Sequence, residues 1–571
     1  MPASRLRRPQ WVAGFAVALA LVLAGCTPPG TPVPVPTVTA LTQVPESATS
    51  VLPSADAAGL ALQASRAFFS SAPVAVVAPA GDAPSELTAA SIAAGLGVPV
   101  LLAGGDATVE AVTDELARLG TGTVLGVGEL PDLLPDSDEP EDGESTASPA
   151  SAEVVAIPAQ PESRQILGRL FAEQDAVAAG GQVAALSALD VTGLSILRLE
   201  GAPAPTALAS EGPGDQEWTE PTLPVLAETA RVNDVTVISD GSPPQAAAVG
   251  TARAAGATVL TFAGGDPRAS SEAIEALALA QPATVVALGP SFGAADELAW
   301  RVATAATGVE LPGGTQLVFG AKRYAALYGT PGSGALGVLG EQGTEATIAR
   351  ARQHAAALQP FTQDLVLPSL EIIASIASAG AGPDGDYSNT RPVSELRPLV
   401  QAAGDAGLYV VLDLQPGRTD FLTQARMYEE LLLMPHVGLA LDPEWRLLPH
   451  QRHLVQIGSV GIDEVNSVVA YLADLVRTNN LPQKLLILHQ FKLSMIRDRD
   501  RLDTSRAELA MMIHVDGQGP QPAKTDTWNA LRAGAPDVYW GWKNFYDEDV
   551  PMLNPEQTMR VAPMPHLVSY Q

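Results

Sequence analysis

Hydrophobic residues recur in the second half of the chain as short runs that end in polar or aromatic residues. The run Val437–Leu441 reads V-G-L-A-L and is followed by Asp442, Glu444 and Trp445. Short apolar runs of this kind are typical of parallel strands that are buried on both faces. The pattern predicts strands at 336–340, 368–376, 409–413, 437–442, 485–490, 510–516 and 538–542, with 566–571 as the candidate for an eighth.

Segments of helical length separate these runs. The predicted helices lie at 344–358, 394–404, 420–433, 463–478 and 525–533. Strands alternating with helices in this way predict a (β/α) TIM-like barrel over residues 326–571. The run Gly332–Gly337 matches G-x-G-x-x-G, but it precedes a predicted strand instead of following one. We therefore expect a tight turn into the first barrel strand and no dinucleotide site.

The first half of the chain contains an internal duplication. Val74–Glu129 and Val235–Pro290 each alternate apolar runs with Ala-rich segments, and each carries the tetrad A-G-G-D, at Ala103 and at Ala263. Each copy reads strand, helix, strand, helix, strand, which is a parallel doubly wound unit. The predicted fold is thus α/β, with two doubly wound parallel α/β repeat units (56–215 and 216–325) before the barrel. The paired glycines, Gly104-Gly105 and Gly264-Gly265, should occupy equivalent turns.

The two copies resemble a known family of surface proteins. The segment A-A-S-I-A-A-G-L-G-V-P-V-L-L-A (Ala89–Ala103) and the closing T-V-L-G-V-G are similar to the cell wall-binding repeat type 2 family. This resemblance implies that the repeat units bind cell-wall polysaccharide at the cell envelope.

The N-terminus has the features of an export signal. Arg5, Arg7 and Arg8 precede a short apolar run, Trp11–Leu23, which is short for a membrane-spanning helix. Leu23-Ala24-Gly25-Cys26 then resembles the lipobox of bacterial lipoproteins, and Cys26 is the single cysteine of the chain. The resemblance implies a signal peptide over 1–26, lipidation (palmitate) of Cys26 and anchoring to the extracytoplasmic face of the cell membrane. Residues 27–55 are rich in Pro, Thr and Ser, which predicts an extended tether.

Net charge indicates which partners are excluded, and composition indicates which half of the chain contains the functional site. The formal net charge of -30 argues against nucleic acid as a partner. Every lysine, histidine and tyrosine lies from Lys322 onward. We therefore expect the catalytic or binding residues to lie in the second half of the chain. No cofactor is expected.

Carboxylates and tryptophans follow several predicted barrel strands, where the C-terminal ends meet at one mouth. In this general sense the barrel resembles glycoside hydrolases, in which two carboxyl groups cleave the bond and aromatic faces stack on sugar rings. The catalytic candidates are Asp413, Asp442, Glu444 and Asp516, and the candidates for substrate binding are Trp445, Gln490, His514, Trp540 and Trp542. The period of two puts Asp442 with Glu444, and His514 with Asp516, on shared strand faces.

Three functions fit these observations. The first is a membrane-anchored lipoprotein that binds and hydrolyses cell-wall polysaccharide. The second is a glycan-binding or scaffolding lipoprotein without catalysis. The third is a metal-dependent envelope hydrolase with His489, His514 and Asp442 or Asp516 as ligands. Any one of the acids also fits a structural role, such as a helix cap at Asp463, and Glu371 falls early enough in its strand to lie inside the barrel.

Overall fold

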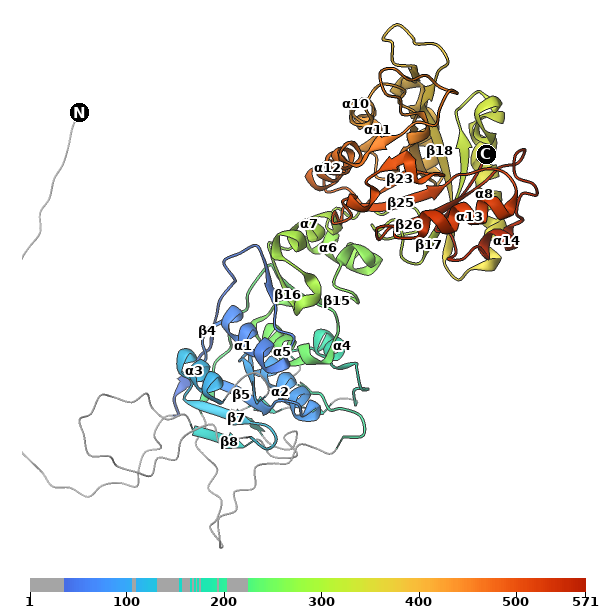
Figure 1. Ribbon diagram of the computed structural model, residues 1–571. Coiled ribbons are helices and arrows are strands. Elements are labelled where there is room, and N and C mark those ends of the chain that lie inside the picture. The colour runs from blue at the N-terminus through green and yellow to red at the C-terminus, as the bar shows by residue number, and fades with distance from the viewer. Residues whose placement is uncertain are drawn as a thin grey trace, which may run out of the picture.

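The computed structural model describes residues 35–104, 109–130, 153–156, 165–166, 169–170, 172–173, 176–192, 195–202 and 224–571. Figure 1 shows the repeat units in one lobe and the C-terminal barrel in the other. Cys26 and the signal segment lie outside the described residues, so lipidation remains a prediction. No helix among the described residues is long and apolar enough to cross a bilayer.

The two repeat units have matching parallel sheets. In both sheets the first strand of the copy lies between the second and the third, which confirms two doubly wound units. The first sheet has the order β6 (Val100–Ala103), β5 (Val74–Pro79), β7 (Thr123–Gly126), β8 (Glu153–Ala156), and the second has the order β15 (Thr258–Thr261), β14 (Val235–Ser239), β16 (Thr284–Leu288), β3 (Thr49–Leu52).

The fourth strands come from different parts of the chain. β8 follows the copy Val74–Glu129 in sequence, whereas β3 precedes both copies and pairs in parallel with β16 of the second unit. The prediction of an extended tether up to residue 55 is therefore wrong for the described residues before 55. The four residues of Thr49–Leu52, two polar and then two apolar, show no period of two and do not reveal a strand without the partner that pairs with them.

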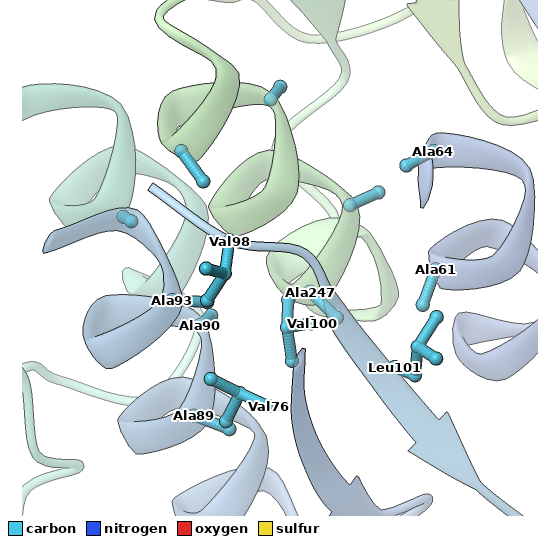
Figure 2. Close-up of a cluster of buried hydrophobic side chains, with 14 of the residues drawn as sticks. Ala61, Ala64, Val76, Ala89, Ala90, Ala93, Val98, Val100, Leu101 and Ala247 are labelled. Atoms are coloured by element: carbon cyan, nitrogen blue, oxygen red, sulfur yellow. The ribbon is translucent and has the colours of Figure 1, made fainter. Parts of the chain in front are cut away.

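The units pack through equivalent helices. α2 (Ala83–Leu96) and α5 (Ala246–Ala255) both follow the first strand of their copy, and both are rich in alanine. A Cβ atom on Gly250 would lie 2.7 Å from Ala90 Cβ and 2.9 Å from Ala90 O. Small residues thus let the two helix backbones approach closely. α1 (Ala57–Phe68) packs beside α5, and Figure 2 shows Ala61, Ala64, Ala90, Ala93 and Ala247 among the buried side chains of this shared core.

The described members of the paired glycines all have positive φ, but only those of the second copy lie in a turn, since Gly104 is a bridge residue directly after β6. Gly104 has φ 112°, Gly264 has φ 88° and Gly265 has φ 73°, and Gly105 lies outside the described residues. A side chain at Gly265 would also overlap the carbonyl of Ser291. At Gly265 glycine is therefore required both by conformation and by space, whereas at Gly264 only the conformation favours it.

The C-terminal half is a closed barrel of eight parallel strands, as predicted. The first strand pairs with both the second and the last, which closes the sheet. The strands are β17 (Lys322–Gly329), β18 (Leu365–Ala377), β20 (Tyr409–Leu414), β21 (Val437–Leu441), β23 (Lys484–His489), β25 (Leu509–Val515), β26 (Tyr539–Asn544) and β27 (Leu567–Tyr570), and β19 (Ser388–Thr390) pairs antiparallel with β18.

The first barrel strand differs from the prediction. Residues 336–340 form no strand; two short 3-10 helices, η5 (Gly334–Leu336) and η6 (Val338–Glu341), occupy this segment. β17 lies earlier and begins at Lys322, four residues before the predicted start of the barrel. A Cβ on Gly340 would overlap the carbonyls of Thr330 and Ser333, so the glycine-rich segment folds back tightly over the end of β17.

Helices cover the outside of the barrel. They are α8 (Thr344–Leu358), α9 (Val393–Asp405), α10 (Phe421–Met427), α11 (Glu429–Leu432), α12 (Ile462–Thr478), α13 (Gln521–Arg532) and α14 (Pro555–Met559). The predicted helix 420–433 is divided in two at Tyr428. Asp463 is not the N-cap of α12, because Gly461 holds that position and Asp463 lies in the first turn.

Candidate functional site at the C-terminal end of the barrel

The barrel interior changes from apolar to ionic along its axis. Near the N-terminal ends of the strands, Tyr324, Tyr409, Leu485 and Met512 belong to one apolar cluster. Gly438 leaves room there for the ring of Tyr409, whose hydroxyl would lie 2.9 Å from an added Cβ. This apolar layer closes the lower part of the barrel, so the chemistry is confined to the C-terminal end.

The layer above it is made of polar side chains, each 3% exposed or less. The members of this polar layer are Tyr328, Glu371, Asp413, Asp442, His489, His514, Lys543 and Ser569. Each comes from or directly follows a different strand of the barrel. Parallel strands bring their C-terminal ends to one edge, so eight distant parts of the sequence converge here.

His489 lies at the centre of the polar layer. Its Nε2 lies 2.7 Å from Glu371 Oε1, and its Nδ1 lies 3.1 Å from Asp516 Oδ2. Burial lowers the pKa of His489, but the two neighbouring carboxylates outweigh burial and raise its pKa well above the usual value. Burial likewise raises the pKa values of Glu371 and Asp516, and His489 outweighs it and keeps both below their usual values. The three side chains form an ionised triad.

His514 is the uncharged neighbour of that triad. It is paired in register with His489 on the adjacent strand, and the two Nδ1 atoms are 3.4 Å apart. Its Nε2 lies 3.1 Å from Ser569 Oγ. Burial lowers the pKa of His514 to about 3. Its ring occupies space that exists because residue 541 is glycine, since a Cβ there would overlap the imidazole.

Asp413 and Asp442 hold protons more tightly than ordinary carboxyl groups. Burial and the charge of Glu371 raise the pKa of Asp413 to about 6, although the hydroxyl of Tyr328 donates a 2.7 Å hydrogen bond to its Oδ2. Burial raises the pKa of Asp442 well above the usual value. Asp442 also accepts a hydrogen bond from the Glu444 N–H at 3.2 Å, which caps the short helix η8 (Pro443–Trp445).

Glu444 lies at the mouth and is partly exposed, above the buried polar layer. Burial and the charge of Asp516 raise the pKa of Glu444 to about 7, while Lys543, His489 and Lys492 act in the opposite direction. A carboxyl group that titrates near neutral pH and is within reach of solvent is suited to donate a proton.

Two of the predicted tryptophans do not face the site. Trp540 and Trp542 point outward from β26 and pack edge to face against Trp528 of α13, with ring centroids 5.8 Å and 5.5 Å apart. The expectation that they line the mouth is wrong, because the inward residues of this strand are Gly541 and Lys543. Lys543 Nζ lies 3.4 Å from the ring centroid of Tyr328 inside the barrel.

Gln490 is also placed differently from the prediction. It is fully buried, its Oε1 accepts a 2.6 Å hydrogen bond from Arg499, and its Nε2 donates to the Lys492 carbonyl at 3.1 Å. Its polar atoms are therefore occupied within the loop after β23. Trp445 remains at the mouth, partly exposed, with its ring 5.3 Å from the ring of His453.

The structure thus brings together Asp413, Asp442, Glu444, His514 and Asp516. The sequence pattern placed Glu371 inside the barrel without a role, and Lys543 was not among the candidate residues. It did not single out Tyr328 or Ser569. The period of two along each strand carried the signal for Lys543, but Tyr328 lies on β17, which the pattern did not reveal.

The polar layer also contains a group with metal-ligating atoms. One ligand atom from each of Glu371, His489 and His514 lies within 4.8 Å of the others. Two imidazoles and one carboxylate are a donor set that suits a divalent transition metal.

Comparison with known proteins identifies no family for this chain. No family model matches it, and no curated protein sequence matches it. Among solved structures, Cwp6 from Clostridium difficile matches with a TM-score of 0.31 and 11% identity, covering 66% of each chain. The chain thus spans slightly less than two thirds of that structure, and a TM-score at this level does not establish a common fold.

Proposed function

We propose that the barrel hydrolyses glycosidic bonds of an envelope polysaccharide, with Glu444 as the general acid and the neighbouring Asp516 as the carboxylate base or nucleophile. The observation that carries this proposal is the placement of Glu444. It is the partly exposed carboxyl group of the cluster, held by η8 directly above buried acids at the C-terminal mouth of a closed parallel barrel.

The chemistry needs two carboxyl groups in opposite protonation states. One protonates the departing glycosidic oxygen, while the other activates water or attacks the anomeric carbon. The pKa of Glu444, near 7, keeps much of this group protonated at neutral pH. Asp516 is 8% exposed and its Oδ2 is bonded to His489, which favours the carboxylate form. Trp445 at the same mouth offers an aromatic surface for a sugar ring.

The rest of the chain would keep this chemistry at the envelope. The lipobox at Cys26 supports a lipid anchor on the extracytoplasmic face of the membrane, and the duplicated units support binding of wall polysaccharide through their resemblance to wall-binding repeats. Replacing Cys26 with Ala should release the protein from the membrane fraction of a suitable bacterium. Unchanged membrane retention with a normal mature mass would contradict the anchor.

The acid role of Glu444 can be tested with Glu444→Gln. The amide cannot donate the proton, so turnover of envelope polysaccharide should fall by about 10²–10⁴-fold. Turnover of dinitrophenyl glycosides should fall much less, because their leaving group departs without protonation. Glu345→Gln, at an exposed position in the first turn of α8, is the matched control and should leave both rates unchanged.

Asp516→Asn tests the second carboxylate. If Asp516 acts as nucleophile or base, polysaccharide turnover should fall as far as in Glu444→Gln, and added azide should restore turnover of the activated glycosides. A wild-type protein that binds wall polysaccharide but hydrolyses neither substrate would contradict catalysis and support a glycan-binding lipoprotein instead.

A further inference from the structure

The polar layer, together with Glu444 and Asp516 at its upper edge, contains more acids than cations. The carboxyl groups of Glu371, Asp413, Asp442, Glu444 and Asp516 converge there, against one lysine, Lys543, and two histidines. Unbalanced charge is costly in a buried interior, so such a cluster either takes up protons or binds a cation.

Several oxygens in this layer have no hydrogen-bond partner. Glu371 Oε2, Asp413 Oδ1 and Asp516 Oδ1 are all buried and accept no hydrogen bond within the described residues, although Asp413 Oδ1 lies 3.9 Å from His489 Nε2. Buried oxygens of native proteins nearly always have a partner. These three point to a species inside the barrel that accepts their lone pairs.

The spacing of the nitrogens indicates the kind of species. The Nδ1 atoms of His489 and His514 are 3.4 Å apart, which is long for a hydrogen bond between two rings. Two ligands that are each about 2.0–2.1 Å from a tetrahedral ion are separated by about 3.3 Å. The separation of the two Nδ1 atoms therefore suits a shared metal ion. Glu371 Oε1 lies 2.7 Å from Nε2, on the other side of the His489 ring, so Glu371 joins these nitrogens on one ion once the ring or the carboxylate turns.

We propose that Glu371, His489 and His514 bind a single divalent transition-metal ion of the Zn²⁺ class inside the barrel. The three ligands come from β18, β23 and β25, and the two histidines are partners in the register of adjacent strands. Ligands on strands are held more rigidly than ligands on loops. Nitrogen donors favour Zn²⁺, Co²⁺ or Ni²⁺ over Ca²⁺ and Mg²⁺.

This site goes beyond the proposed hydrolysis and does not depend on it. In the metal-free form, His489 holds protons between Glu371 and Asp516, and metal binding would displace a proton from a ring nitrogen into solvent. The ion would then take over the balancing of charge beneath Asp442 and Glu444.

Metal content measures the proposal directly. Purified full-length protein, stripped with chelator and dialysed against Zn²⁺, should retain about one equivalent by mass spectrometry and should unfold at a higher temperature than the stripped form. Loading with Co²⁺ should give the intense visible absorption of a tetrahedral site. Wild-type protein that retains no Zn²⁺ at micromolar free metal would overturn the proposal.

Variants locate the site. His514→Gln and Glu371→Gln should each lose the equivalent of metal and the Co²⁺ absorption, with circular dichroism confirming that they remain folded. If a variant does not fold, the other still decides the outcome. His450→Ala, at an exposed position in the loop after β21, is the control and should keep full metal content. Retention of metal by both folded variants would assign it elsewhere.

Glu444→Gln separates the metal site from the proposed hydrolysis. This variant should keep its metal while losing polysaccharide turnover, because Glu444 is not a ligand. Metal without hydrolysis in the wild type would leave the site intact and contradict only the proposed function.

Discussion

Both halves of the protein are parallel α/β structures, but they bury different kinds of side chain. The repeat units share a core of Ala, Val and Leu, and Glu115, a fully buried acid there, accepts hydrogen bonds from Ser65 and Arg118. The upper barrel instead buries a cluster of acids around one histidine, with several oxygens unpaired. The first arrangement serves packing, and the second holds groups in protonation states that a stable core does not need.

The difference follows from how the elements of each half pack. In the repeat units helices pack against helices, and small side chains are sufficient for this close contact. A closed barrel directs inward residues from eight strands into one volume, where they must match each other in charge and size. Substitutions in each half should show whether stability depends on steric fit in the repeat units and on charge in the barrel.

The largest effect is expected from His489→Leu. Removing this cation leaves Glu371 and Asp516 buried without a partner, which should lower the free energy of unfolding of the barrel by about 3–5 kcal/mol. Urea unfolding followed by fluorescence of the Trp528, Trp540 and Trp542 cluster would measure it. Ile487→Val is a control one layer below on the same strand face, and should cost about 0.5–1.5 kcal/mol. If both variants lose the same free energy of unfolding, the buried charge of His489 contributes no more to stability than an apolar side chain.

Gly250→Ala tests the steric fit of the repeat units. Alanine normally stabilises the middle of a helix, but here its Cβ would approach Ala90 to 2.7 Å. Overpacking should instead destabilise the repeat lobe by about 1–3 kcal/mol. Hydrogen exchange of peptides from α2 and α5 would report it without interference from the barrel. Gly122→Ala is the control, since an added Cβ there meets nothing within 4 Å. A stabilised Gly250→Ala protein would contradict the close contact.

The pH dependence of stability should reveal Glu444. Its pKa in the folded protein is about 7, raised from 4.5, so the fold favours the protonated form. The stability from this group is therefore complete below about pH 4.5 and is lost as pH rises through about 7. Asp516, Lys543, His489 and Lys492 are the charged groups that act on it.

The measurement compares wild type with Glu444→Gln. Between pH 4.5 and 7 the free energy of unfolding of wild type should fall by about 1–2 kcal/mol more than that of the variant, after allowance for partial solvent exposure. The Gln variant lacks the titrating group and is its own control. Parallel profiles would show that Glu444 titrates normally.

The smallest effect is expected at the surface. Asp463 pairs with Arg501 at 3.0 Å, but their side chains are 83% and 61% exposed. Asp463→Ala should therefore change the free energy of unfolding by less than about 1 kcal/mol, and high salt should reduce the difference further. If Asp463→Ala loses as much free energy of unfolding as His489→Leu, then exposed and buried ion pairs contribute equally to stability in this protein.

Local pattern in the sequence determined the architecture of each half. The duplicated apolar runs predicted two equivalent sheets, and apolar strands alternating with helical segments predicted the barrel. The period of two, with parallel strands ending at one edge, was enough to bring Asp413, Asp442, Glu444, His514 and Asp516 together. These features depend on residues that are close in sequence, so periodicity carries them.

Other features were decided by contacts between distant segments. Both faces of a barrel strand are buried, so the sequence Y-W-G-W-K does not show which of its residues point into the barrel. The imidazole of His514 determines this orientation, because its ring fits only against a glycine at position 541. β3 becomes a strand because β16, far along the chain, offers it an edge. The charge state of His489 likewise depends on Glu371 and Asp516, which only closure of the barrel places on either side of its ring. Propensity and periodicity are local, whereas packing space and buried charge belong to the assembled structure.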